Sequence, residues 1–236
     1  MNTKYPLAST AALIADPARA AMLTSLLDGR SSPAGELART ANVSAQSASM
    51  HLAQLVDGGF LKVLQQGRHR YYRISKPEVA HVIEALGVIS TAQKYKPTRA
   101  DQALYYARTC YDHLAGELAV ELTAALERNG LMVADGQRNY DLTPRGELFF
   151  RQWNIDAPAL RRLRRGFAKR CLDWTERRDH VAGALGAAIC ERFMELRWIT
   201  RDQHSRTVHV SQSGRQQLSR LLNLPPVESR LAVRRP

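Results

Sequence analysis

The pattern of hydrophobic and polar residues is most regular between residues 44 and 58. Four apolar side chains recur there at the spacing of one face of an α-helix: Ala48, Leu52, Leu55 and Val56. Ser44 is of a type that caps helix N-termini, and Gly58-Gly59 is a signal that ends helices. The sequence therefore predicts a helix over this segment that packs its apolar face into a core.

The opposite face of this helix has short polar or flexible side chains and no carboxylate before Asp57. The residues on it are Gln46, Ser47, Met50 and Gln54. Hydrogen-bonding groups without negative charge suit a groove whose walls are phosphates. We therefore predict a DNA recognition helix, with contacts to DNA from Ser44, Gln46, Ser47, Ser49, Met50 and His51.

The residues before this helix predict the first part of a helix-turn-helix. Asp16-Pro17 begins a helix that ends near Gly29, because a capping residue and a proline occupy its first positions. Ser32-Pro33 repeats that signal and begins a short helix that ends before Asn42. A short turn then leads into the recognition helix, as in the helix-turn-helix plan.

The residues after the recognition helix predict a β-hairpin wing. Residues 60–64 and 70–74 are predicted strands, and residues 65–69 form the turn between them. Basic side chains at this tip are predicted to contact phosphates or the minor groove, namely Arg68, His69 and Arg70. A further helix from Pro77 to about Ile89 is of the kind that pairs with its counterpart in a second copy of the chain.

Several consecutive segments resemble the ArsR family of bacterial winged-helix repressors. They are Asp16–Arg19, Gly35–Ala38, Val43–Leu52, Leu55–Leu61 and Gly67–Tyr72. The resemblance covers about residues 9 to 90. It implies a transcriptional regulator that binds promoter DNA as a homodimer and releases it when an inducer binds, often a metal or metalloid.

Two departures from the family pattern concern the inducer. The family's best-known metalloid site has cysteines in the helix before the recognition helix, but Glu36–Arg39 contains none. Another recurrent site uses carboxylates and histidines of the last helix, where this chain has only Glu78, His81 and Glu84. The resemblance therefore does not identify the inducer.

The chain continues far beyond the resemblance, and its tail repeats itself. Residues 113–131 align without a gap to residues 180–198, and residues 140–146 match residues 208–214. The alignment pairs Leu114, Leu118, Leu122 and Leu126 with Val181, Leu185, Ile189 and Phe193, the buried row of one helix. Each copy predicts a helix, two short strands and a capped helix, which is the second half of a winged helix.

The predicted fold class is mainly α-helical with small β-hairpin wings. We predict a winged helix-turn-helix domain for DNA binding and dimerisation over residues 1–92, a linker over 93–99 and a regulatory domain over 100–236. The regulatory domain is expected to contain two degenerate winged-helix-like repeats, about residues 100–158 and 166–224. Their helices carry glutamates that repel phosphate, so we do not expect them to bind DNA: Glu117, Glu121, Glu127, Glu191 and Glu195.

Composition agrees with a nucleic-acid partner. The chain has 34 lysines and arginines against 22 aspartates and glutamates, a formal charge of +12, which favours a polyanion. Its densest basic run, residues 161–170, is either a phosphate-binding segment or a solvated helix face. No pattern of a signal peptide or membrane span is present, so the protein is predicted to be cytoplasmic and without a membrane partner.

Three cysteines are too few, and odd in number, for a disulfide framework. Both repeat copies nevertheless have a cysteine before the shared histidine. Cys110 and His113 have a spacing that suits a metal, and a second set would complete the site if the copies face each other: Cys171, Asp173 and His180. A soft metal ion suits these ligands, although the sequence requires no cofactor.

Other interpretations of these residues stay open. In the simplest, each histidine caps its helix and each cysteine packs as a small apolar side chain. In another, a thiol senses oxidants, because Arg170, Arg177 and Arg178 near Cys171 lower its pKa. In a third, an organic effector binds against aromatic side chains, namely Tyr105, Tyr106, Tyr111 and Trp174.

The predicted function is that of a sequence-specific DNA-binding regulator. We expect a homodimeric repressor of double-stranded DNA, released by a small molecule, a metal or a redox event in the C-terminal domain. One alternative is an enzyme with Cys110 or Cys171 as nucleophile, but no acyl-transfer or phosphate-loop signature accompanies them, and no enzyme is predicted. Another is a nonspecific nucleoid protein driven by charge.

Overall fold

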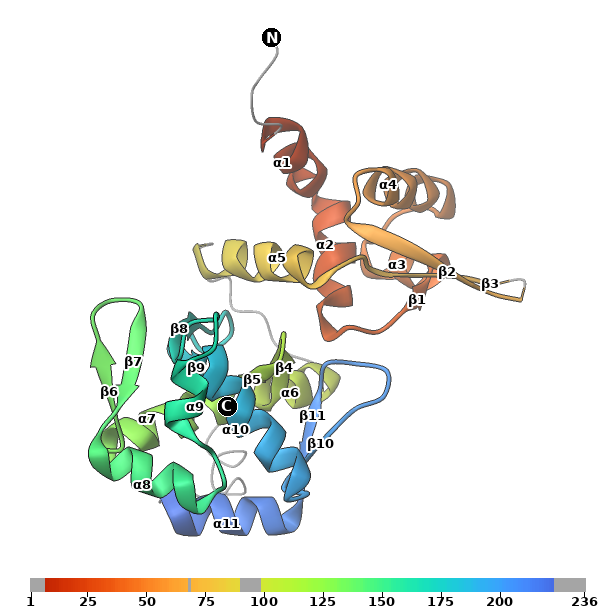
Figure 1. The fold of residues 1–236 in the computed structure, drawn as a ribbon. Coiled ribbons are helices and arrows are strands. Elements are labelled where there is room, and N and C mark those ends of the chain that lie inside the picture. The colour runs from red at the N-terminus through yellow and green to blue at the C-terminus, as the bar shows by residue number, and fades with distance from the viewer. Residues whose placement is uncertain (1–6, 68, 90–98, 223–236) are drawn as a thin grey trace, which may run out of the picture. The chain divides into compact units, whose positions relative to one another are not determined.

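The computed structural model describes residues 7–67, 69–89 and 99–222. The chain divides into two compact units, one of residues 1–90 with 203–206 and the other of residues 91–202 with 207–236. Figure 1 shows their elements. The predicted linker, residues 93–99, lies outside the described residues except for Arg99.

The first unit is a winged helix-turn-helix, as predicted. Its elements are α1 (Leu7–Ala15), α2 (Pro17–Ser25), the 3₁₀ turn Leu26–Asp28, β1 (Ser32–Pro33), α3 (Ala34–Thr40), α4 (Ala45–Asp57), β2 (Leu61–Gln66), β3 (His69–Ile74) and α5 (Pro77–Ile89). The core lies between the helices and the antiparallel sheet β1-β3-β2. The predicted core face of α4 is confirmed, because Ala48, Leu52 and Leu55 are fully buried, while Val56 is half-buried and packs against the same core.

Helix starts in this unit follow the capping residues that the sequence indicates. The Asp16 carboxylate accepts a hydrogen bond of 2.9 Å from the backbone N–H of Arg19, and the Ser44 hydroxyl accepts one of 3.1 Å from that of Ser47. Ser32-Pro33 differs from the prediction. These residues form a short strand that pairs with Tyr72 and Tyr71 of β3, so α3 begins at Ala34 without a side-chain cap.

The wing is longer than predicted. The strand pairing runs from Leu61 opposite Ile74 to Gln66 opposite His69, so residues 65, 66 and 69 belong to strands and not to the turn. Only residues 67 and 68 connect the strands, and Arg68 lies outside the described residues. A two-residue connection of this kind holds the strands in register up to the tip.

The second unit has the same element order twice. Its elements are α6 (Arg99–Tyr106), β4 (Arg108–Cys110), β5 (His113–Ala115), α7 (Glu117–Arg128), β6 (Met132–Asp135), β7 (Asn139–Leu142), α8 (Pro144–Gln152), α9 (Ala157–Arg161), β8 (Lys169–Leu172), β9 (Asp179–Ala182), α10 (Gly183–Glu195), β10 (Ile199–Arg201), β11 (Val208–Val210) and α11 (Gln212–Leu222). Hairpin, helix, hairpin and helix thus follow one another from β4 to α8 and again from β8 to α11 (Figure 1). The interpretation of these halves as degenerate winged helices stays a prediction.

The helices α7 and α10 occupy the centre of this unit. Side chains of both belong to one hydrophobic core, together with Phe150 of α8 and Trp153 at the end of that helix. Seven of the twelve residues of α7 are buried, and seven of the thirteen of α10. Neither helix therefore has a broad exposed face of the kind that α4 has.

A glycine stands at the start of the long helix in both halves, at aligned positions. Gly116 has φ +88° and ψ −173°, a conformation that is essentially restricted to glycine. A Cβ atom at this position would lie 2.6 Å from the carbonyl oxygen of Tyr105. Gly183 is similar, with φ +78° and a Cβ position 2.6 Å from the carbonyl oxygen of Gly166. Close backbone packing thus fixes both residues as glycine.

We predict that Gly116→Ala destabilises the second unit far more than Gly136→Ala. Gly136 has φ +66° but open space around it, so its variant bears only the left-handed strain, about 1–2 kcal/mol. Gly116→Ala adds a backbone clash that costs about 1–3 kcal/mol more. Urea unfolding followed by tryptophan fluorescence measures the difference, because Trp153, Trp174 and Trp198 all belong to this unit. Equal losses for the two variants would contradict the close packing.

Candidate functional site

The polar face of α4 is exposed at its N-terminal end. Gln46, Ser49 and Met50 are exposed, and Met50 presents 56% of its surface. Ser47 is half-buried, and its hydroxyl accepts a hydrogen bond of 2.9 Å from the Ser44 hydroxyl. The surface therefore combines hydroxyl and amide groups with one flexible apolar side chain, and no charge lies among them.

The C-terminal half of the same helix is tied to the helices before it by Arg19. Its guanidinium donates hydrogen bonds to the backbone oxygens of Leu13 and Ala12, at 2.6 and 2.8 Å, and to the Gln54 side chain at 2.5 Å. It also lies 3.5 Å from Nδ1 of His51. Gln54 and His51 thus help to orient α4, a role that the helical pattern alone did not predict.

His51 has a second polar neighbour at the start of α2. Its Nδ1 lies 3.8 Å from the Asp16 carboxylate, and its side chain is 13% exposed. The His51 side chain is therefore less accessible to a ligand than the side chains of Gln46 and Met50. Arg19 stands in the Asp16–Arg19 segment, but nothing in the pattern of that segment indicates a contact with Gln54 or His51.

The wing presents its polar residues beside one another in two strands. His69 and Arg70 of β3 are exposed and pair with Gln66 and Gln65 of β2. At the base of the wing Tyr72 is buried in the core of the unit. The strand is thus anchored at one end, and its polar end is available to a ligand.

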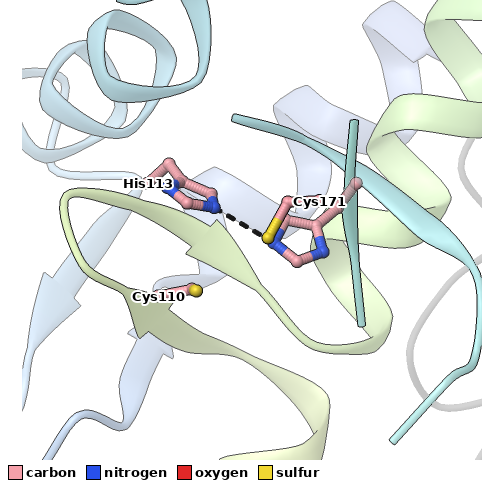
Figure 2. Close-up of side chains that lie close together, drawn as sticks. Cys110, His113 and Cys171 are labelled. Carbon is pink, nitrogen blue, oxygen red and sulfur yellow. Dashed lines mark hydrogen bonds between the residues drawn. The ribbon is translucent and has the colours of Figure 1, made fainter. Parts of the chain in front are cut away.

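A second group of candidate residues comes together in the second unit. Cys110 of β4 stands directly opposite His113 of β5, and Cys171 of β8 stands directly opposite His180 of β9. Directly opposed residues of antiparallel strands point to the same face. Figure 2 shows the side chains of Cys110, His113 and Cys171 turned toward one another.

The four side chains form a compact, largely buried cluster. The Nε2 atoms of His113 and His180 are 3.2 Å apart. One ligand atom from each of the four residues lies within 4.8 Å of all the others. Cys110, His113 and His180 are buried, and Cys171 is half-buried. A hydrogen bond with Cys171 and burial raise the pKa of the Cys110 thiol to about 11.

Asp173 lies beside this cluster but is engaged by another partner. Its two carboxylate oxygens accept hydrogen bonds of 2.9 Å each from the buried Arg108 guanidinium. The backbone N–H of Gly116 and the Thr175 hydroxyl donate further bonds of 2.7 Å. Burial alone would raise the pKa of Asp173, but Arg108, Thr175 and Gly116 hold that pKa well below its usual range. Asp173 is therefore ionised although it is buried. One of its oxygens lies 3.6 Å from Nδ1 of His180.

The histidines do not cap helices, so this part of the simplest interpretation is wrong. His113 and His180 lie on strands, and the N-cap residues of α7 and α10 are Gly116 and Ala182. The physical reason is that the chain remains extended for two more residues after each histidine. Cys190 of α10 is fully buried in the core, as expected for a structural residue.

The other residues singled out in the sequence are engaged within the unit. Tyr105 packs edge-on against Trp174 with ring centroids 5.5 Å apart, and Arg108 stacks over the Trp174 ring. In the basic run, three arginines form surface ion pairs, Arg161 with Asp141 and Glu147, Arg165 with Asp112, and Arg170 with Asp179. The charge of that run is thus partly balanced by neighbouring carboxylates.

Among the described helices, none combines the length and apolar character that crossing a membrane requires.

Comparison with known proteins places the helix-turn-helix in a recognised group. A family model described as a helix-turn-helix domain matches residues 14–63. A protein of Bacillus subtilis (strain 168), described as an uncharacterized HTH-type transcriptional regulator, YdfF, is 42% identical over 221 residues. The match covers 92% of this chain and 97% of that relative.

Two solved structures are similar over a smaller part of the chain. The homodimeric winged helix-turn-helix DNA-binding domain of Mb0332 from Mycobacterium bovis, a possible ArsR-family transcriptional regulator, is 23% identical. The match covers 38% of this chain and 89% of the Mb0332 chain, with a TM-score of 0.34. HlyU from Vibrio cholerae is 29% identical, and the match covers 36% of this chain and 94% of the HlyU chain, with a TM-score of 0.33.

We predict that Asp173→Asn destabilises the second unit by about 3–5 kcal/mol, because it leaves the buried Arg108 guanidinium without a counter-charge. Asp179→Asn is the matched control, since Asp179 forms a partly exposed pair with Arg170 that contributes about 0–1 kcal/mol. Urea unfolding monitored by tryptophan fluorescence measures both variants. If Asp173→Asn cost no more than the control, the buried pair would not be a main support of this unit.

Proposed function

We propose that this chain, which belongs to the family of HTH-type transcriptional regulators, binds specific DNA sequences as a homodimer of the ArsR type. The observation that carries the proposal is the exposed face of α4, with Gln46, Ser49 and Met50 presented on a helix that is fixed by its core. An α-helix of this kind fits the major groove of B-form DNA.

The chemistry of α4 suits base edges. A glutamine side chain both donates and accepts hydrogen bonds, and it pairs in a bidentate manner with adenine. A serine hydroxyl forms hydrogen bonds with base edges, and an apolar side chain such as methionine packs against the methyl group of thymine. We infer that Gln46, Ser47 and Met50 contact bases, while Ser44 at the helix N-terminus contacts a phosphate.

The wing supports this orientation. The exposed Arg70 and His69 lie on a hairpin that is anchored by Tyr72. A cationic hairpin beside a recognition helix provides phosphate contacts that position the protein without reading sequence. Arg68, outside the described residues, belongs to the same proposed set.

The homodimer is proposed from an apolar stripe on α5. Val82, Leu86 and Ile89 recur at helical spacing, and 46%, 40% and 78% of their surfaces are exposed. Such a stripe on a helix of a small unit is typical of a surface that packs against a second copy. A homodimer places two recognition helices on half-sites about one helical turn apart.

The second unit is proposed to regulate and not to bind DNA. The long helices of the two halves, α7 and α10, are largely buried, so little of either helix is free to enter a groove. We propose that an effector event in this unit changes the dimer so that both α4 helices no longer fit successive grooves, which makes the protein an inducible repressor.

For base contacts, we predict that Gln46→Ala weakens binding by about 1–3 kcal/mol and relaxes preference at one base position. The measurement uses the full chain and a duplex selected by it from a random library, at fixed salt. Gln152→Ala, an exposed glutamine of α8 in the other unit, is the matched control. A preference unchanged by Gln46→Ala would remove α4 as the specific contact, and broad protection in footprinting would indicate a nonspecific architectural protein.

For the wing, we predict that Arg70→Ala weakens binding by a similar factor on every sequence. The slope of log K against log salt then falls by about one, because one phosphate contact is lost. Arg151→Ala, an exposed arginine of α8, provides the matched control. A salt slope that stays at the wild-type value would show that the wing does not contact the backbone.

For dimerisation, we predict that Leu86→Asp converts the protein to a monomer and abolishes tight operator binding. The reason is that a carboxylate in an apolar interface lacks a partner. Leu148→Asp, which changes a leucine of α8 that is 58% exposed, serves as control and leaves the dimer intact. Sedimentation equilibrium measures the mass, and a dimer retained by Leu86→Asp would exclude α5 as the interface.

A further inference from the structure

We propose that Cys110, His113, Cys171 and His180 form a tetrahedral binding site for one zinc ion per chain within the second unit. This site goes beyond the proposed DNA-binding function and is testable without DNA. The geometry of the two hairpins carries the proposal, because each supplies one thiol and one imidazole from directly opposed strand positions.

The strand register explains why the four side chains meet. In each hairpin the cysteine on the first strand and the histidine on the second face the same side. The strands β5 and β9 lie next to each other, so that the histidines of the two hairpins touch at Nε2. Two matching pairs from two matching hairpins thus converge on one point.

The distances fit a tetrahedral ion of this size. With zinc–nitrogen bonds of about 2.0–2.1 Å, two nitrogen ligands of a tetrahedron lie about 3.4 Å apart. The Nε2 atoms of His113 and His180 are 3.2 Å apart without any adjustment. All four ligand atoms lie within 4.8 Å of one another, so small side-chain rotations complete the coordination shell. A set of two sulfur and two nitrogen ligands is typical of zinc.

Charge also favours a divalent ion here. Two thiolates and two neutral imidazoles around a divalent cation give a site of zero net charge, which a buried location requires. The protons of the two thiols leave to solvent when the ion binds. The nearby Arg108 and Asp173 already balance each other, so they leave no excess charge beside the site.

Both histidines have a carboxylate behind the ring, on the side away from the cluster. Nδ1 of His113 lies 3.5 Å from Asp112, and Nδ1 of His180 lies 3.6 Å from Asp173. A metal-bound imidazole generally donates its other N–H to such a carboxylate, which fixes the ring. Nδ1 of His180 is buried without a hydrogen-bond partner in the described structure, and the protonated Nδ1 of a metal-bound His180 has Asp173 as its acceptor.

The site is closed, since protein side chains supply all four ligands. Closed sites of two cysteines and two histidines stabilise folds and leave no position for a substrate. Cys171 is half-buried and provides the side from which the ion enters. The ion would connect the first hairpin of one half to the first hairpin of the other.

Cobalt binding to the full chain tests the site. The protein, reduced and freed of metal with a chelator, is titrated with Co²⁺ and then with Zn²⁺. We expect one equivalent of Co²⁺ with the intense visible bands of a tetrahedral centre and a sulfur-to-cobalt charge-transfer band, both lost when Zn²⁺ displaces it. A second test needs no variant: in the wild-type protein loaded with zinc, a thiol-specific mercurial is expected to release the ion.

Matched variants assign the ligands. Cys171→Ser and His180→Gln lose the charge-transfer band or the tetrahedral spectrum, and their affinity falls by more than the roughly 10–100-fold expected for an outer-shell change. Cys190→Ala and His209→Gln, which change a cysteine and a histidine outside the cluster, keep both signals. Tryptophan fluorescence checks that each variant is folded.

Three results would overturn the proposal. They are the absence of stoichiometric binding by the folded wild-type chain, an octahedral cobalt spectrum, and a Cys171→Ser variant that is indistinguishable from wild type. If the reduced chain bound no metal and two of its thiols formed a disulfide under mild oxidation, the cluster would be assigned to redox sensing instead. These results do not depend on DNA, so they distinguish failure of the zinc site from failure of the proposed regulator function.

Discussion

The buried ion pair of Arg108 and Asp173 is the interaction on which the second unit most depends. It joins residues 65 positions apart in the sequence, and both side chains are almost inaccessible to solvent. Two desolvated charges are tolerated because they are paired directly, and because Thr175 and Gly116 donate further hydrogen bonds to the carboxylate. The same carboxylate also lies 3.6 Å from Nδ1 of His180, one histidine of the cluster.

The first unit depends on a different kind of constraint, namely the packing of one helix. Ala48, Leu52 and Leu55 of α4 are completely buried, and Arg19 fixes the C-terminal half of this helix against α1 and α2. Its N-terminal half remains exposed. A surface that is presented by a rigid helix loses little conformational freedom on binding, so it discriminates between partners with few contacts.

Helix caps, which join residues close together in the chain, were predictable from the sequence, and contacts between distant residues were not. Asp16 and Ser44 cap their helices as the sequence indicates, because a cap involves residues only three positions apart. The pairing of Ser32 with Tyr72, and of Arg19 with Gln54, joins segments whose patterns have no signal for each other. For the cysteine–histidine cluster, the sequence indicated the residues. Only the structure shows that both hairpins present them to one point, while Asp173 is engaged by Arg108.

The matching hairpins have a consequence for ancestry. Each half of the second unit contributes one sulfur and one nitrogen atom from equivalent positions, which is half of the proposed zinc shell. If the halves arose by duplication of one gene segment, a single-copy ancestor would have supplied only half of this proposed shell, and two chains would have been needed to complete it. Fusion of the two copies would then have placed all four donors in one chain. The two halves would remain alike at these donors and also at Gly116 and Gly183, which close packing fixes as glycine.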